Sequence, residues 1–171
     1  MFTIEVKDTG VKDALSALSA KVGNMQPILQ SIGEDIMERT KARFATSTGP
    51  DGARWKPNAR STIEAFIGSK GGFGKKGINK KGQGLGMSKK PLIGHSGDLR
   101  RQFHISATAN SVTVGNSMIY AAIHQFGGKA GRGKKVAIPA RPFLPIRENG
   151  YLYADEQASI LDAINAYLAG K

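Results

Sequence analysis

Two glycine-rich segments come close to motifs that bind nucleotide phosphates. Residues 128–135 read G-K-A-G-R-G-K-K, but Lys135 stands where the phosphate loop needs a Ser or Thr to hold magnesium. Prolines follow this segment, whereas phosphate binding needs the N-terminus of a helix there. Residues 72–77 fit G-x-G-x-x-G but neither follow a predicted strand nor begin a predicted helix. Neither segment therefore predicts nucleotide binding.

The sequence also gives little support for a catalytic nucleophile or a metal site. Residues 94–97 read G-H-S-G, but the nucleophile elbow needs a glycine at position 98, which is Asp98. A Ser-Gly-Asp turn before the next element is the better interpretation. His95, His104 and His124 have no metal-ligand spacing, and the chain has no cysteine. We expect His124 to support packing or a hydrogen bond, and we expect no catalytic residue, metal or cofactor.

The net charge of +12 is concentrated in two segments. Residues 68–90 hold eight glycines, seven lysines and no acid, and residues 127–141 hold five cations and no acid. Their combined charge equals the whole net charge, so the rest of the chain is near neutral. We expect 68–90 to be a mobile basic arm that orders only against a partner, and 127–135 to be a second basic loop.

Two partners fit such loops. One is DNA, whose phosphates glycine-rich basic loops approach without sequence preference, and the other is an acidic protein surface or an acidic lumen. No named reader motif for nucleic acid is present, which argues against sequence-specific recognition. The residues expected to face DNA or a lumen are Lys70, Lys75, Lys76, Lys80, Lys81, Lys89, Lys90, Lys129, Arg132, Lys134 and Lys135.

The elements that must position these loops follow from hydrophobic periodicity. Alternation predicts a strand over 2–6 and a hairpin in which 103–105 pairs with 112–114, while 119–126 could be a helix or a strand. Helical spacing predicts helices over 11–22, 26–45 and 154–168, with a loop over 46–60 and an extended, proline-rich path over 136–145. The chain is expected to be one α+β domain over 1–171, with a small antiparallel sheet packed by two long helices and two projecting Gly/Lys-rich basic loops.

Three residues have two interpretations each. Trp55, the one tryptophan, lies in a polar loop and should either pack back as an anchor or lie in an interface. Arg39 and Arg43 fall near the apolar face of the 26–45 helix. Their stems should carry the charged heads outward to solvent, or the heads should contact another subunit.

The N-terminus has no signal-peptide pattern, and no run approaches the roughly 18 apolar residues of a membrane span. We therefore expect the chain to be made in the cytosol and to have no membrane partner.

Several segments together resemble the phage virion morphogenesis family, in its Mu-like group. The matching pieces are Phe44, 52–57 (G-A-R-W-K-P), 95–99 (H-S-G-D-L), 114–116 (V-G-N), 120–128 (Y-A-A-I-H-Q-F-G-G) and 138–144 (I-P-A-R-P-F-L). Their order and spacing resemble the family pattern over roughly residues 26–147, and the last two pieces are the most specific.

The resemblance implies a non-enzymatic structural protein of a tailed phage that completes the tail or joins it to the head. It implies a hexameric or dodecameric ring, with tail tube and neck or connector proteins as neighbours. It places the chain in the virion, after assembly in the host cytoplasm. The expected assembly contacts are Trp55, Arg39, Arg43, Tyr120, His124, Phe126, Arg141 and Phe143. The alternatives are a DNA-binding protein without sequence specificity and a capsid-assembly factor.

Overall fold

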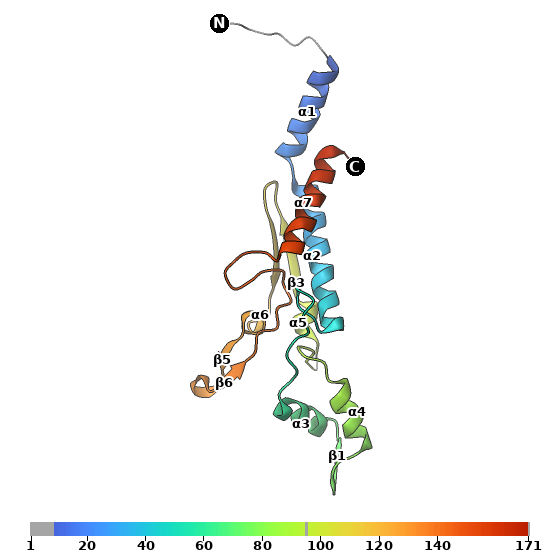
Figure 1. Cartoon of the computed structure of the whole chain (residues 1–171), viewed down its shortest axis with the longest axis vertical. Helices are drawn as coiled ribbons and strands as arrows, with labels where there is room; N and C mark the ends of the chain where they lie inside the picture. The colour runs from blue at the N-terminus through green and yellow to red at the C-terminus, as the bar shows by residue number, and fades with distance from the viewer. Residues whose placement is uncertain (1–8, 95, 171) are drawn as a thin grey trace.

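The computed structural model describes residues 9–94 and 96–170, so the predicted strand over 2–6 and His95 lie outside the described residues. The molecule is elongated, with α1 (Thr9–Gly23) at one end and two projections at the other (Figure 1). The strands form three two-stranded antiparallel sheets, and with the helices they confirm the predicted α+β class. The remaining elements are α2 (Gln26–Thr46), α3 (Arg60–Ser69), β1 (Phe73–Gly74), β2 (Gly77–Ile78), α4 (Lys80–Ser88), α5 (Asp98–Arg101), β3 (Phe103–Ala107), β4 (Val112–Asn116), α6 (Ala121–Phe126), β5 (Gly128–Ala130), a 3₁₀ turn (Arg132–Lys134), β6 (Val136–Ile138) and α7 (Ala154–Ala169).

The body of the molecule is built on α2 lying against the β3–β4 hairpin. Pro27 occupies the first turn of α2, where its missing N–H costs nothing. Gly33 lets the helix approach the sheet closely, because a Cβ there would meet methyl groups of Ile105 and Val112 at 2.8 Å each. The predicted helix over 26–45 and the predicted hairpin are both confirmed.

An aromatic cluster joins the C-terminal end of α2 to the loops around it. Phe44 and Phe143 are fully buried, and their rings lie 5.4 Å apart. The Trp55 ring meets Phe44 edge-on at 5.4 Å, and Phe103 contacts both phenylalanines. Such edge-to-face pairs add about 0.5–1.5 kcal/mol each beyond the burial of apolar area. The cluster fixes the loop over 46–60 to the body.

The two remaining predicted helices are also confirmed. α7 packs along α2 and ends at Gly170, which has a left-handed backbone as a C-terminal cap requires. α1 extends beyond the body and touches it through the last turn of α7, where the Lys21 ammonium donates to the carbonyl of Tyr167 at 3.2 Å. Leu15, Leu18 and Val22 of α1 are exposed.

The prediction that residues 68–90 lack regular structure is wrong. They continue α3, form the β1–β2 hairpin and then form α4, which packs on α3. The glycines permit this packing: a Cβ on Gly82 would overlap the Gly72 carbonyl, and Ile67 is buried beneath them. The Asn79 side chain caps α4 by accepting from the Gly82 amide at 2.8 Å. We call residues 60–88 the helical projection.

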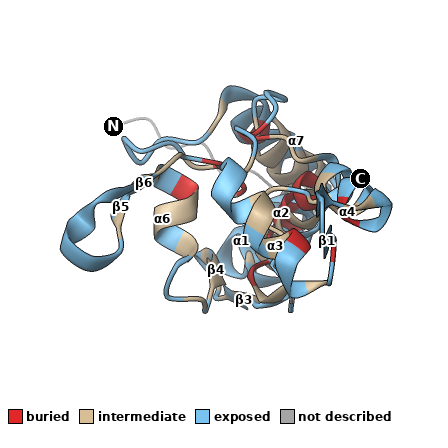
Figure 2. Ribbon diagram, turned by 90° about the horizontal axis from the view of Figure 1, so that it is seen from below, coloured by how far each residue is buried: buried red, intermediate tan, exposed pale blue. Residues whose placement is uncertain are grey.

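The second basic segment is also more regular than a loop. Gly128–Ala130 pairs with Val136–Ile138, so residues 128–138 form a β-hairpin that we call the hairpin projection. From Pro139 to Pro145 the chain has no regular secondary structure and runs into the aromatic core, as its prolines predict. Seen along the long axis, the hairpin projection points to one side, while α2 and α7 lie on the other (Figure 2). Within residues 119–126, Ala121–Phe126 form a helix, α6, and the two residues before it form a turn.

Candidate assembly surface

The 120–128 and 138–144 segments, which resemble the family pattern, are joined by hydrogen bonds that stabilise the body. The Gln125 side chain of α6 is buried and makes four hydrogen bonds. Its oxygen accepts from the amides of Phe143 and Leu144 at 2.9 Å, and its nitrogen donates to the carbonyls of Leu144 and Ile146 at 3.1 and 3.0 Å. Both N–H groups and both oxygen lone pairs of this amide are thereby used. Gln125 fixes the extended segment after β6 to α6.

Arg141 and Trp55 join the same segment to the loop before α3. The buried Arg141 guanidinium donates to the carbonyls of Lys56 and Pro57 at 2.7 Å each. The Trp55 indole donates to the Pro142 carbonyl at 2.8 Å. Trp55 therefore packs back as an anchor, which is the first of its two predicted interpretations. Burial lowers the pKa of Arg141 below its ordinary value.

Arg43 does not extend to solvent, so that prediction is wrong for it. Its guanidinium is buried against the Glu156 carboxylate of α7 and donates to the Phe143 carbonyl at 2.8 Å. Burial lowers the pKa of Arg43, and Glu156 opposes the shift. Arg39 bridges Asp35 at 2.6 Å and Glu156 at 3.2 Å, and its side chain is one-third exposed.

Two residues of this network were not among the predicted sites. Gln125 lies inside a motif segment, but its sequence position gives no sign of four hydrogen bonds. Glu156 could have been found, because two arginines near the apolar face of one helix need a carboxylate from another.

The exposed residues among the predicted assembly contacts gather on α6 and just before it. Tyr120 is 38% exposed and Phe126 is 41% exposed, and the neighbouring Ile119 is 97% exposed. The His124 ring lies edge-on to Tyr120 at 5.9 Å, half-buried. Large apolar side chains on a surface are typical of protein–protein contact sites. The predicted contacts Trp55, Arg43, Arg141 and Phe143 are instead buried within the chain.

His124 faces a positive environment. Burial lowers its pKa, and the charge of Arg141 lowers it further. Its Nδ1 is buried with no hydrogen-bond partner among the described residues. The fold therefore favours the neutral form of the ring.

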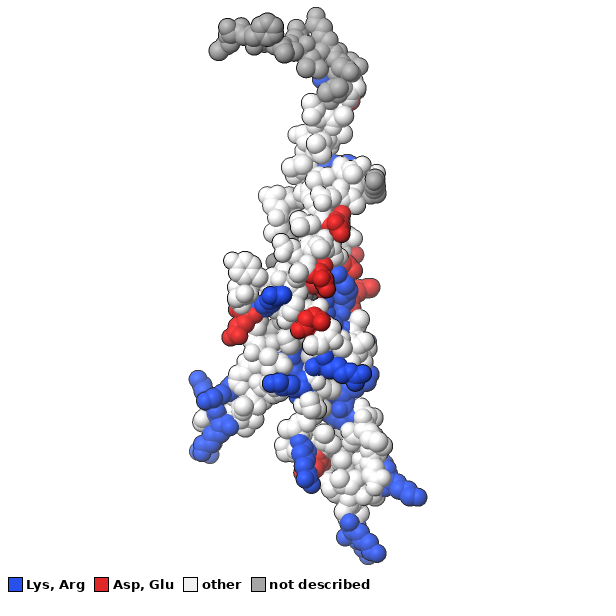
Figure 3. All heavy atoms as spheres, in the orientation of Figure 1, with Lys and Arg blue, Asp and Glu red and all other residues white. Residues whose placement is uncertain are grey.

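The predicted DNA- or lumen-facing lysines lie on both projections at one end of the molecule. The hairpin projection carries Lys129, Arg132, Lys134 and Lys135, all exposed. The helical projection carries Lys70, Lys75, Lys76, Lys80 and Lys81, and Lys89 and Lys90 follow it. Acidic side chains gather farther along the long axis, on α2 and α7 (Figure 3). The charge is thus separated along the molecule.

No helix in the described residues has the length and apolar character needed to cross a membrane. Within the same residues, no three His, Asp or Glu side chains group as metal ligands would.

The comparisons with known proteins agree with this geometry. Mu-like prophage FluMu G protein 2 of Haemophilus influenzae is 57% identical over 58 residues, which cover 34% of this chain and 38% of that protein. The alignment thus spans well under half of that relative's length. No solved structure matches the chain. The pattern of the phage virion morphogenesis family matches residues 6–169, almost the whole chain, so the chain belongs to that family and serves in phage virion morphogenesis.

Proposed function

We propose that this chain is a non-enzymatic structural protein that forms a head-to-tail ring at the tail end or neck, where it completes the tail and joins it to the head. The observation that carries this proposal is the match to the virion morphogenesis family over residues 6–169. The resemblance of the 120–128 and 138–144 segments to the Mu-like group supports a role at the tail.

The shape of the molecule supports ring formation. A head-to-tail ring needs two different patches on roughly opposite sides of each subunit. The hairpin projection and the α2–α7 side meet that condition (Figure 2). Their exposed charges are complementary as well, because residues 128–138 have four cations and no acid, while α7 exposes Asp155 and Asp162 and has no cation. Neighbouring copies would therefore attract each other side by side.

The remaining partners follow from the same arrangement. The helical projection continues along the long axis, where it would meet the tail tube or a neck protein rather than a copy in the same ring (Figure 1). Exposed Ile119, Tyr120 and Phe126 supply an apolar surface beside the hairpin projection. Ring symmetry should be six-fold, or twelve-fold if the chain joins a connector.

The test is the native mass of the purified chain at low and at physiological salt, followed by binding to tails purified from a particle that lacks the protein. Defined rings in solution, or rings seen on the tail ends, would support the proposal. A monomer that also fails to bind tails would overturn it.

A DNA-binding protein without sequence specificity is the second candidate, and the separation of charge favours it. Such a protein would bind DNA as a monomer, with an affinity that falls steeply as salt rises. A monomer that binds DNA but does not bind tails would therefore favour this second candidate.

A further inference from the structure

Three hollows on the basic end of the molecule form one continuous trough. The first, of about 490 Å³, lies between α2 and α5, and the second, of about 760 Å³, lies between the loop at 56–59 and β6. The third, of about 330 Å³, lies beside α3. All three share Ile93 and Gly94 as lining residues. We call this combined surface the basic trough.

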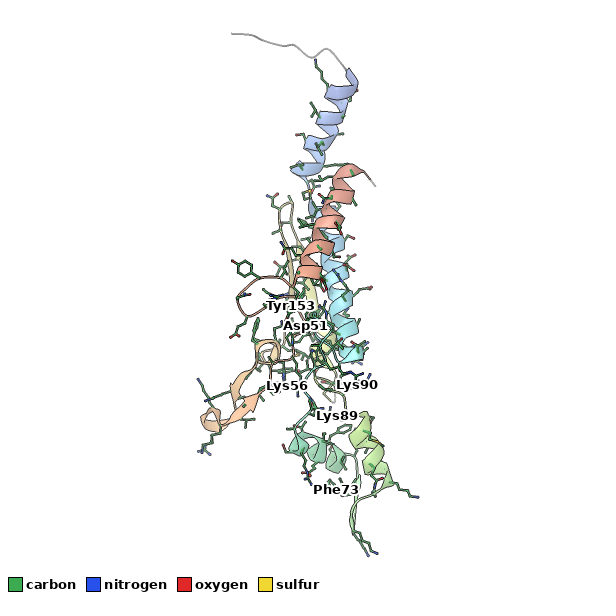
Figure 4. The ribbon with its side chains drawn as sticks, in the orientation of Figure 1. Asp51, Lys56, Phe73, Lys89, Lys90 and Tyr153 are labelled. Carbon is green, nitrogen blue, oxygen red and sulfur yellow. The ribbon has the colours of Figure 1, made fainter. Side chains whose placement is uncertain are left out.

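The basic trough has a strong excess of positive charge. Its only carboxylate among the described residues is Asp98, which accepts a hydrogen bond from Ser96 at 2.5 Å. Figure 4 shows three of its lysines between the body and the helical projection. The cations that line it are Lys41, Lys56, Lys70, Lys89, Lys90, Arg100, Arg101 and Arg141.

Some of these cations already serve the fold. Arg141 is buried against backbone carbonyls, Lys89 donates to the Ile93 carbonyl, and Lys90 donates to the Ala45 carbonyl at 2.6 Å. Four cations have no ion pair or side-chain hydrogen bond in the part of the chain that the structure describes: the half-buried Lys41 and the exposed Lys56, Arg100 and Arg101. None of these four was among the residues that the sequence predicted to face DNA. They come from three separate points of the chain, at 41, 56 and 100–101, which the fold alone brings together.

Gly94 keeps the centre of the trough open. A Cβ at this position would meet no atom within 4 Å, and its backbone is not in the left-handed region, so the fold does not require glycine there. A side chain at position 94 would instead enter the space that all three hollows share. The position therefore offers a way to fill the trough without disturbing the body.

We propose that the basic trough binds the phosphodiester backbone of double-stranded DNA. Adjacent arginines on α5 suit bidentate contacts to phosphate oxygens, and Lys41 and Lys56 add point charges to either side. The duplex carries one negative charge per roughly 1.7 Å, which matches a surface with many cations and a single acid. The inference deepens the proposed function, since a neck ring surrounds the path of the genome, and it assigns the DNA contact to the body as well as to the projections.

The trough is not uniform. Beside β6 its wall includes apolar Leu92, Tyr120 and Ile138, and an acidic polypeptide with apolar side chains would fit that part. Lys56 lies in that part too, but Lys41, Arg100 and Arg101 line the hollow between α2 and α5, and phosphate contacts need charge and no apolar wall. DNA is therefore the better match for the region under Arg100 and Arg101.

The experiment measures binding of a fluorescent 30-base-pair duplex of arbitrary sequence to the full chain as salt is raised. Gly94→Glu should weaken binding at least about tenfold at about 50 mM salt, because it places a negative charge against the phosphates. The matched control is Gly23→Glu at the far end of the molecule, where a Cβ also meets nothing within 4 Å. It changes the net charge equally and should bind almost as wild type. Arg100→Ala with Arg101→Ala should lower the salt slope by about two.

Equal DNA binding by Gly94→Glu and Gly23→Glu would overturn the proposal. So would a wild-type chain that ignores DNA but captures poly-glutamate and loses it in Gly94→Glu, since the trough would then take an acidic polypeptide. The native mass of every variant is measured alongside. Rings that persist in Gly94→Glu with unchanged DNA binding would refute the trough and leave the proposed function standing. Absence of rings and of tail binding in wild type, with DNA binding intact, would refute the proposed function and leave the trough.

Discussion

The body and the projections use the same residue types for opposite purposes. In the core of the body, two arginines are buried and paired, Arg43 against Glu156 and Arg141 against the carbonyls of Lys56 and Pro57. On the hairpin projection, cations stand exposed on a two-stranded hairpin with almost no apolar contact beneath them. The buried charges of the body stabilise the fold, whereas those of the hairpin projection are exposed to solvent.

The segments that resemble the family pattern contribute mainly to the body. Four of their side chains, Trp55, Gln125, Arg141 and Phe143, are buried in the body and join α6, the segment after β6 and the loop over 46–60 to one another. Substituting them should therefore act on stability first and on assembly only through it. The residues that meet partners are expected among the exposed side chains of α6, the projections and the trough.

The largest effect should come from breaking the buried pair. Glu156→Gln leaves the Arg43 guanidinium buried without its counter-charge and should cost about 3–5 kcal/mol of unfolding free energy. Urea denaturation measures it. The control is Asp162→Asn, which removes an exposed acid two turns farther along α7 and should change stability by less than about 0.5 kcal/mol. Equal effects of the two changes would mean that the pair does not stabilise the body.

Glycine should have opposite roles in the two regions. Gly33→Ala pushes a methyl group into Ile105 and Val112 and should destabilise the chain by about 1–3 kcal/mol, despite the better helix propensity of alanine. Gly84→Ala, in α4 of the helical projection, meets no atom within 4 Å and should stabilise that helix by up to about 1 kcal/mol.

Thermal and urea unfolding compare both variants with wild type. If Gly33→Ala raised the free energy of unfolding, the close approach of α2 to the sheet would be contradicted. If Gly84→Ala lowered it, this face of α4 would have to be in contact with another part of the chain.

The sequence predicted the regular elements of the body well and the projections poorly, for a physical reason. Amphipathic periodicity marks α2 and α7, and alternation marks β3 and β4, because each buries one face against the body. In residues 68–90 the same glycines that suggested a mobile arm allow α4 to pack on Gly72. Glycine content alone cannot distinguish flexibility from close packing. Nor could composition reveal the trough, since Lys41, Lys56 and Arg100 come together through the fold alone.

A smaller effect should appear as pH dependence at the base of the hairpin projection. Because burial and Arg141 lower the pKa of His124, the folded chain favours the neutral ring, and the unfolded chain takes up a proton near its ordinary pKa of about 6.5. Stability should therefore fall as pH drops from above this value toward the lowered pKa. His124→Phe removes the titration and should lose less stability than wild type between pH 7.5 and 5.5. Parallel losses, measured as urea midpoints, would contradict this assignment.

The smallest effect on stability is expected where the effect on assembly is greatest. Lys134→Ala with Lys135→Ala alters exposed side chains of the hairpin projection and should change the unfolding free energy by no more than about 0.5 kcal/mol. If the hairpin attracts the α2–α7 side of a neighbouring copy, the same variant should shift the native mass toward monomer at physiological salt. Lys75→Ala with Lys76→Ala on the helical projection removes two exposed charges that the proposal does not place between copies of the same ring, and it serves as the control for assembly. If the Lys134→Ala, Lys135→Ala variant lost folding stability but kept its native mass, the hairpin would be part of the folded body and not an assembly contact.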